Sequence, residues 1–284
     1  MQPDQLRARL EGPIGFPVTP FRDDLSLDIP GLRRNVRALL AHPPASIVAA
    51  GGTGELYSLT PAEHREVVST VVAECAGRVP VIAGVGFNAA LAAQLAADSA
   101  AAGAHGILAF PPYYPNADDA GLVDYYRAIG DATPLGLLIY SRDWFHPGPG
   151  ILERLATIPT LVAWKDGQGD LRRLQILMAA IGDRLRWIGG AGDDMVPAYY
   201  AAGVRAYTSS VSNVSSRLAR RLHDLACART GAAVSMASAA SPAAVAATGD
   251  PLDAVMRQLI VPLYAMRARR RGYEVTVMKE LMNL

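Results

Sequence analysis

The sequence predicts an α/β protein built as a (β/α)8 TIM barrel with an appended C-terminal helical segment. Short apolar runs alternate with stretches of helical spacing from the N-terminus to about residue 230. There are eight such runs, and eight parallel strands joined by crossover helices are the number that closes a barrel. An open doubly wound sheet is the alternative, because counting strands in a single sequence is error-prone.

Each expected strand is an apolar run followed by a cluster of Gly, Pro, Ser or Asn residues. The eight runs are Ile14–Thr19, Ser46–Ala50, Val79–Gly84, Gly106–Phe110, Leu135–Tyr140, Leu161–Lys165, Leu185–Ile188 and Val204–Thr208. Thr60-Pro61-Ala62-Glu63 predicts a helix start with a capping box and proline at the first helical position. Gly103 and Gly203 predict the ends of helices over Ala89–Ala102 and Met195–Ala202.

We expect the barrel to span residues 1–230 and a helical extension to span residues 231–284. The Ala/Ser-rich stretch Ala232–Ala247 fits either a close-packed helix or a mobile segment, and a break follows near Gly249-Asp250-Pro251. The basic run Arg267–Arg271 is expected to be a solvated helix face rather than a nucleic-acid site.

The composition excludes several classes of protein. Hydrophobic residues make up 51%, charged residues 19%, and the net charge is +1, so nothing suggests binding to nucleic acid or an anionic membrane. Cys75 and Cys227 are too few for a disulfide framework. The N-terminus lacks the pattern of a signal peptide, and no apolar run reaches the roughly 18 residues of a membrane span. We expect a cytoplasmic protein.

Lys165 is the first candidate for a nucleophile. Only two of the 27 basic residues are lysines, and this one stands in an apolar run. A desolvated ammonium loses its proton easily, and a neutral amine attacks a carbonyl to form a Schiff base. A lysine that snorkels from a strand end to water is the alternative. By alternation one face of the strand carries Leu161, Ala163 and Lys165, and the other carries Val162, Trp164 and Asp166.

Active sites of such barrels lie at the C-terminal ends of the strands. Tyr140 ends the strand before Lys165, where a phenol could relay protons or simply fill the barrel top. Gly51-Gly52-Thr53-Gly54-Glu55 could cradle a carboxylate or phosphate, or be a tight loop. Gly189–Gly192 has three alternative interpretations: a loop of small residues, part of the rim around a substrate, or a phosphate-binding site. Thr208-Ser209-Ser210 adds hydroxyl groups to the same rim.

The sequence lacks the motifs of metal-dependent, serine-hydrolase and dinucleotide-dependent enzymes. The five histidines are scattered without a metal-binding spacing, and the sequence has neither a Gly-x-Ser-x-Gly elbow nor a Gly-x-Gly-x-x-Gly fingerprint. We therefore expect no metal and no cofactor.

Several segments of this sequence together resemble the dihydrodipicolinate synthase/N-acetylneuraminate lyase superfamily of class I aldolases. The resemblance runs from about residue 12 to 215 and again through Arg269–Lys279. The residues that carry the resemblance are Phe16–Phe21, Gly51–Glu55, Pro80–Gly86, Tyr140 and Lys165. A second set looks most like the 5-dehydro-4-deoxyglucarate dehydratase branch: Gly51–Glu55, Tyr140–Asp143, Lys165–Asp170 and Arg270–Val275. Ser141 stands where that branch usually carries Asn.

The resemblance implies roles for individual residues. Lys165 would form the Schiff base with an α-keto acid, Tyr140 would relay protons, and Gly52 and Thr53 would hold the α-carboxylate. The dehydratase branch removes water and CO2 from a six-carbon keto-diacid and gives 2,5-dioxopentanoate. Arg142 could clamp the distal carboxylate, or could be a surface arginine paired with Asp143.

The resemblance also implies the rest of the site and the assembly. Thr208 and Ser209 would line the side opposite Arg142, and Gly190 would also bind the substrate. Pro112-Tyr113-Tyr114 looks like the synthase branch, in which the second tyrosine reaches into a neighbouring subunit's site. The expected partners are therefore a small keto acid and further copies of the chain, as a homodimer or homotetramer.

Three other functions stay open at this point. The nearest is a pyruvate-dependent aldolase or synthase of the same superfamily, such as dihydrodipicolinate synthase. A phosphate-binding barrel enzyme would use Gly189–Gly192 and would not need Lys165. A non-catalytic protein that binds keto acids would bind its ligand without turnover.

Overall fold

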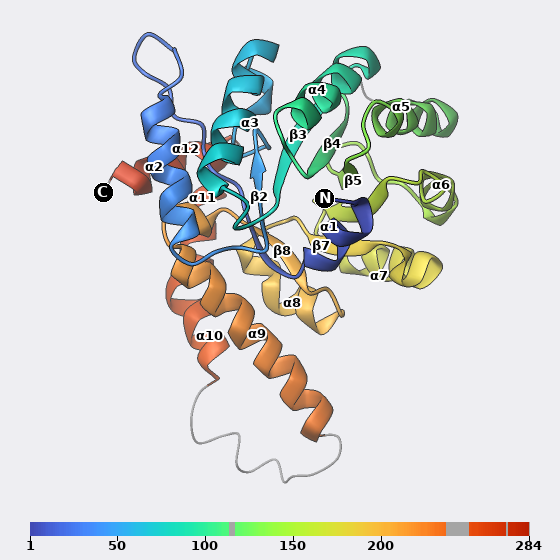
Figure 1. The fold of residues 1–284 in the computed structure, drawn as a ribbon. Helices are drawn as coiled ribbons and strands as arrows, with labels where there is room; N and C mark the ends of the chain where they lie inside the picture. The colour runs from blue at the N-terminus through green and yellow to red at the C-terminus, as the bar shows by residue number, and fades with distance from the viewer. Residues whose placement is uncertain (114–116, 237–249, 271, 284) are drawn as a thin grey trace.

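The computed structural model describes residues 1–113, 117–236, 250–270 and 272–283. Eight parallel strands close into a barrel in chain order, and β8 pairs back onto β1 (Figure 1). The predicted TIM barrel is thereby confirmed and the open sheet is excluded. The strands are β1 (Gly12–Gly15), β2 (Ser46–Ala49), β3 (Val81–Phe87), β4 (Gly106–Pro112), β5 (Gly136–Ser141), β6 (Leu161–Asp166), β7 (Arg186–Gly189) and β8 (Ala206–Ser209).

Helices surround the barrel as an outer ring (Figure 1). They are α2 (Ile29–Leu40), α3 (Pro61–Cys75), α4 (Ala89–Ala101), α5 (Asp119–Asp131), α6 (Pro149–Leu155), α7 (Leu171–Ile181) and α8 (Val196–Ala201). The predicted capping box of α3 is present: the Thr60 side chain accepts from the Glu63 amide, and the Glu63 carboxylate accepts from the Thr60 amide. Gly103 and Gly203 follow α4 and α8 with φ of +88° and +95°, as the sequence predicted.

Helix α1 (Pro3–Arg9), which the sequence pattern did not reveal, closes the N-terminal end of the barrel. Its Leu6, together with Leu10, is fully buried in the barrel interior. A Cβ on Gly106 or Gly136, the first residues of β4 and β5, would lie 2.5 or 2.9 Å from Leu6. The two glycines therefore make room for the helix, and this end of the barrel is sealed, which leaves the other end for a site.

Two strands depart from expectation for identifiable reasons. Strand β1 ends before Pro17, which has no N–H to donate, and the amide of Val18 donates instead to the Asn213 side chain at 3.1 Å. Strand β3 begins after Pro80 and runs on to Phe87.

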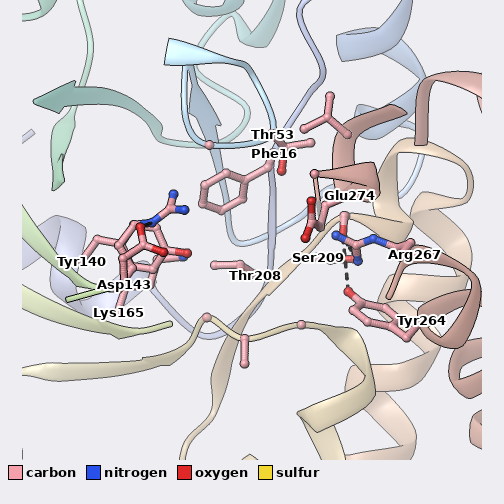
Figure 2. Close-up of a pocket in the computed structure, with 18 of the residues that line it drawn as sticks. Phe16, Thr53, Tyr140, Asp143, Lys165, Thr208, Ser209, Tyr264, Arg267 and Glu274 are labelled. Atoms are coloured by element: carbon pink, nitrogen blue, oxygen red, sulfur yellow. Dashed lines mark hydrogen bonds and ion pairs between the residues drawn. The ribbon is translucent and has the colours of Figure 1, made fainter. Parts of the chain in front are cut away.

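The alternation predicted along β6 is wrong in its first half. Leu137 pairs with Leu161 and Leu138 with Ala163, so the strand carries a β-bulge at Val162. As a result Val162 and Ala163 both pack inside the barrel, whereas Leu161 packs outward against the helices. Beyond the bulge the prediction is correct, because Lys165 points into the barrel mouth (Figure 2).

The C-terminal part of the chain is helical, as predicted. It contains α9 (Ser216–Met236), α10 (Pro251–Val255), a π-helical segment (Met256–Ile260), α11 (Val261–Arg267) and α12 (Tyr273–Asn283). Helix α9 continues unbroken across residue 230, where the sequence suggested a domain boundary. Residues 237–249, which hold most of the Ala/Ser-rich stretch, lie outside the described residues. None of the helices within the described ranges is long and apolar enough to cross a membrane.

Candidate active site

A cavity of about 410 Å3 opens at the C-terminal ends of the strands. All the predicted site residues that the structure describes line it: Gly52, Thr53, Tyr140, Arg142, Lys165, Gly190, Thr208 and Ser209. Tyr114, predicted to serve a neighbouring site, lies outside the described residues. Figure 2 shows two ends to this cavity, with Lys165 and Tyr140 at one and Tyr264 and Arg267 at the other.

Lys165 is 4% exposed, so it does not snorkel to water. Burial lowers the pKa of its amine well below the usual value, the nearby charge of Arg142 lowers it further, and only Asp166 opposes the shift. The amine nitrogen lies 3.0 Å from the centre of the Tyr140 ring and 5.6 Å from that of Phe16. This environment favours the neutral amine that nucleophilic attack requires.

Tyr140 is paired directly with Lys165 in the β5–β6 register. Its ring packs edge-on against Phe110 with the ring centres 5.3 Å apart. Burial raises the pKa of the phenol, so the hydroxyl stays protonated at neutral pH and can donate a proton. The side chain therefore packs the barrel top, and its ring stands beside the amine.

The loop after β2 carries Gly52 and Thr53 along the cavity. A Cβ on Gly51 would lie 2.8 Å from the Phe16 ring, so a larger residue does not fit there. Thr19 donates a 2.7 Å hydrogen bond to the Gly54 carbonyl, and Glu55 ends the turn with φ of +57°. The Glu55 carboxylate forms an ion pair with Lys279 of α12. The C-terminal helix thus holds the loop that was predicted to bind the α-carboxylate.

Arg142 lines the cavity and is also paired with Asp143, at 2.6 Å from Nε to Oδ2. Its guanidinium carbon lies 5.3 Å from the centre of the Tyr140 ring, within range of a cation–π contact. The Nη1 atom lies 3.6 Å from the position that a Cβ on Gly52 would occupy. Arg142 therefore stands at the Lys165 end of the cavity, next to the glycine loop.

The loop after β7 uses its glycines for close packing. A Cβ on Gly190 would lie 2.5 Å from the Asp166 carbonyl oxygen and 2.7 Å from Lys165 Cγ. The Gly190 amide donates to that same carbonyl, at 2.5 Å, and the Ala191 amide donates to Tyr199. Because these amides already have partners within the protein, the loop is poorly suited to cradle a phosphate.

Asp166 fixes the loop that follows the lysine. Its carboxylate accepts hydrogen bonds from the Gln168 amide at 3.1 Å, the Gly169 amide at 3.2 Å and the Tyr199 hydroxyl at 2.7 Å. The last contact ties β6 to α8, so the backbone that carries Lys165 is held from the outer face of the barrel.

The far end of the cavity is built around Asp193, which the sequence analysis did not single out. This carboxylate is fully buried and accepts from Ser209 at 2.5 Å, Tyr264 at 2.7 Å and the amides of Ser210 and Val211. Burial raises its pKa, and these hydrogen bonds act in the opposite direction. The Ser209 hydroxyl, predicted to face the substrate, is engaged with this carboxylate.

The position of Arg267 differs from the prediction for the basic run to which it belongs. The run Arg267–Arg271 was predicted to be a solvated face, and Arg269 and Arg270 are indeed exposed, with residue 271 outside the described ranges. Arg267, however, is half-buried and lines the cavity. It donates a 2.9 Å hydrogen bond to Ser210. Helix α11 ends at this residue and turns its side chain inward, which the charge pattern alone could not reveal.

Several other lining residues were also missed. Tyr57 follows the glycine loop, whereas Tyr264, Glu274 and Val275 come from the C-terminal segment. The resemblance of Arg270–Val275 to the dehydratase branch was a signal that could have found Glu274 and Val275. Within the described ranges no group of three or more His, Cys, Asp or Glu side chains could hold a metal ion.

Known proteins match this chain along its whole length. A probable 5-dehydro-4-deoxyglucarate dehydratase of Bradyrhizobium sp. (strain BTAi1) is 36% identical, over 100% of this chain and 86% of the relative. A second probable 5-dehydro-4-deoxyglucarate dehydratase, from Saccharopolyspora erythraea, is 38% identical over 99% of this chain and 87% of the relative. The crystal structure of dihydrodipicolinate synthase from Bacillus clausii superposes with a TM-score of 0.86 at 27% identity, covering 98% of this chain and 88% of that one.

The family follows from the sequence as well as from the shape of the barrel. Residues 9–240 match the dihydrodipicolinate synthetase family, and that range includes Tyr140, Lys165 and the glycine loop after β2. The chain belongs to the dihydrodipicolinate synthetase family.

Proposed function

We propose that this protein is a Schiff-base-forming lyase that carries out the 5-dehydro-4-deoxyglucarate dehydratase reaction. The observation that carries the proposal is the buried amine of Lys165, whose pKa is lowered by burial, in a cavity that also contains two arginines. A keto group suits the amine and two carboxylates suit the two guanidinium groups. The relatives named as probable dehydratases support the choice of this keto-diacid.

Catalysis would begin with attack of the neutral amine of Lys165 on the keto carbon. The resulting carbinolamine must lose its hydroxyl as water, and a proton donor beside the amine speeds that step. Tyr140 is suited to this role, because its protonated phenol belongs to the residue that pairs with Lys165 across the two strands. Gly52 and Thr53 would hold the α-carboxylate.

The imine then acts as an electron sink. Loss of a proton from the adjacent methylene gives an enamine, which expels the hydroxyl group of the next carbon as water. In the conjugated iminium that remains, the bond to the distal carboxylate breaks, CO2 leaves, and its electron pair flows through the double bonds to nitrogen. Protonation and hydrolysis release 2,5-dioxopentanoate and the free lysine, so one diacid gives one dioxo acid, one CO2 and one water.

A pyruvate-dependent synthase is the second candidate, favoured by the likeness to the Bacillus clausii synthase. It shares the Schiff base with Lys165 and differs in the fate of the adduct. A pyruvate enamine would attack a second carbonyl compound rather than eliminate water.

Borohydride trapping separates these functions. The protein is mixed with 5-dehydro-4-deoxyglucarate and borohydride, and the adduct is weighed by intact-protein mass spectrometry and mapped to a peptide. We expect a reduced adduct on Lys165 that is lighter than the substrate by CO2 and water. An adduct with the full mass of the substrate would support a Schiff base on the lysine but would rule out the dehydratase reaction. The absence of any adduct with this diacid or with pyruvate rejects the lysine mechanism.

A further inference from the structure

The two arginines of the cavity differ in whether their guanidinium groups already bind a carboxylate. Arg142 is bound to Asp143 at 2.6 Å and stands beside Gly52, where the α-carboxylate would bind. Arg267 has no carboxylate within 4.0 Å among the described residues. A guanidinium has five N–H donors, and Arg267 uses Nη1 on the Ser210 hydroxyl, while its Nε is buried without a partner.

Arg267 is nevertheless held firmly in place. Its guanidinium carbon lies 4.4 Å from the centre of the Tyr264 ring, and the Tyr264 hydroxyl is itself bonded to Asp193 and lies 3.2 Å from the Ser210 hydroxyl. A planar guanidinium fixed in this way can recognise a carboxylate without the entropy cost of ordering a free side chain.

The acidic groups at this end do not form an ion pair with Arg267, although its charge opposes the effect of burial that raises the pKa of Asp193 and Asp194. Asp193 is fully buried, and its oxygens accept from two hydroxyls and two amides, which fills its capacity of about four bonds. Glu274 lies near Arg267 in Figure 2, but the two are not an ion pair. Glu274 is exposed and is free to accept a hydrogen bond from a substrate hydroxyl.

We propose that Arg267 is the specificity-determining residue that binds the distal carboxylate of the substrate, in place of Arg142, which serves the α-carboxylate end. This inference rests on the proposed Schiff base with Lys165. The substrate then lies across the cavity from Lys165 past Thr208 to Arg267, an arrangement that Figure 2 follows from left to right. The preference for a diacid is contributed by the C-terminal helix α11 rather than by the barrel.

A pair of matched keto acids tests this assignment. 2-Oxoadipate has six carbons, a keto group and a distal carboxylate but no hydroxyl to eliminate. 2-Oxohexanoate has the same length and differs from it only in carrying a methyl group in place of the distal carboxylate. The concentration at which borohydride trapping on Lys165 is half-saturated is measured for both acids and for pyruvate. The wild-type protein is compared with Arg267→Gln, Arg267→Lys, Arg142→Gln and the exposed control Arg269→Gln.

We expect the wild type and Arg269→Gln to trap 2-oxoadipate roughly tenfold to a hundredfold more readily than 2-oxohexanoate, the range for a lost charged hydrogen bond. Arg267→Gln should bring this ratio close to one with pyruvate trapping unchanged, and Arg267→Lys should restore part of it. Arg142→Gln should weaken the trapping of all three acids alike.

A ratio that survives in Arg267→Gln overturns the proposal, and so does one that disappears only in Arg142→Gln. Loss of pyruvate trapping in Arg267→Gln also counts against it, because the residue would then act on the lysine end. If the wild type traps none of the acids, the Schiff-base function fails, a result distinct from failure of the Arg267 assignment alone.

Discussion

The hydroxyl of Tyr264 donates a 2.7 Å hydrogen bond to the buried carboxylate of Asp193, and the amide of Asp193 donates back to the same hydroxyl at 2.8 Å. Tyr264 belongs to α11, whereas Asp193 follows β7, so the pair joins the C-terminal segment to the barrel rim. The reciprocal bond means that neither group can move without leaving a buried polar atom unsatisfied.

Tyr264→Phe should therefore weaken both stability and recognition of the diacid. The phenyl ring keeps its packing, but Asp193 loses a donor, and we expect a loss of about 1–3 kcal/mol in the free energy of unfolding. Urea denaturation measures this change. The lost hydroxyl also contacts Ser210, the residue that accepts the hydrogen bond of Arg267, so Arg267 should be held less firmly. The half-saturation concentration for 2-oxoadipate should therefore rise while that for pyruvate stays the same. An unchanged unfolding free energy would show that the hydrogen bond is replaceable.

Replacing Lys165 should abolish turnover and change how stability depends on pH. The free energy of unfolding of wild type should rise with pH between the lowered pKa of the folded amine and 10.5, because only the unfolded state holds the proton there. Below that window both states are protonated, and the cost of burying the ammonium is fully present. Lys165→Met removes this cost, so it should be more stable than wild type at pH 7, with the difference shrinking toward pH 10.

Thermal melting across this pH range provides the measurement. Lys279→Met serves as the comparison, because it removes the other lysine of the chain, which is paired with Glu55. A stability difference between wild type and Lys165→Met that is independent of pH would mean that the amine is protonated in the folded protein. The nucleophile would then need a base to activate it.

Tyr140→Phe should keep the fold and slow catalysis. The ring contact with Phe110 is retained, and only the phenolic proton is lost. If that proton is the one relayed to the carbinolamine, turnover should fall by roughly 10²–10⁴-fold. Single-turnover kinetics of diacid consumption check this, and borohydride trapping of pyruvate should slow in parallel. A change of less than about threefold would leave Tyr140 with a packing role only.

The barrel could be predicted from sequence because its signal repeats. Eight apolar runs separated by helical spacing fix the topology, and the strand-end rule then places Tyr140, Lys165 and the glycine loops at one mouth. The errors are local. The bulge at Val162 depends on how β6 pairs with β5, and the end of β1 depends on a bond to Asn213, so neither is visible within the strand itself.

The C-terminal half of the site could not be predicted for a different reason. Helices α11 and α12 lie outside the repeating strand–helix unit, so no rule places their side chains relative to the barrel. Arg267 is one arginine in a basic run, and only the tertiary fold separates it from exposed Arg269. Asp193 lies beside a glycine loop, and its burial depends on Tyr264, which is 71 residues away in the chain.

Gly190→Ala should damage the site through packing alone. The new Cβ would lie 2.5 Å from the Asp166 carbonyl oxygen and 2.7 Å from Lys165 Cγ, so the lysine has to shift. Overpacking of this kind costs about 1–3 kcal/mol of stability, and trapping of every keto acid should slow. Gly150→Ala is the matched control, because a Cβ added there meets no atom within 4 Å, and it should neither lower stability nor slow trapping. Normal trapping by Gly190→Ala would show that the strand end tolerates the shift.

The ion pair between Lys279 and Glu55 should contribute to the binding of every keto acid. The pair ties α12 to the loop that carries Gly52 and Thr53, and Lys279 also lies 5.0 Å from the Phe21 ring. Lys279→Met keeps most of the apolar stem and removes the charge, which frees the loop without touching the cavity. We expect a rise of about twofold to fivefold in the half-saturation concentration for pyruvate and 2-oxoadipate alike, because both need the α-carboxylate loop.

Arg65→Met is its control, since it breaks the ion pair between Arg65 and Asp98 on the outer helices. High salt should reproduce part of the Lys279→Met effect in wild type, because a partly exposed pair is screened by ions. An effect confined to 2-oxoadipate would contradict this assignment, since it would place the influence of Lys279 at the distal end with Arg267. An equal effect in Arg65→Met would mean that loss of any surface ion pair loosens the site.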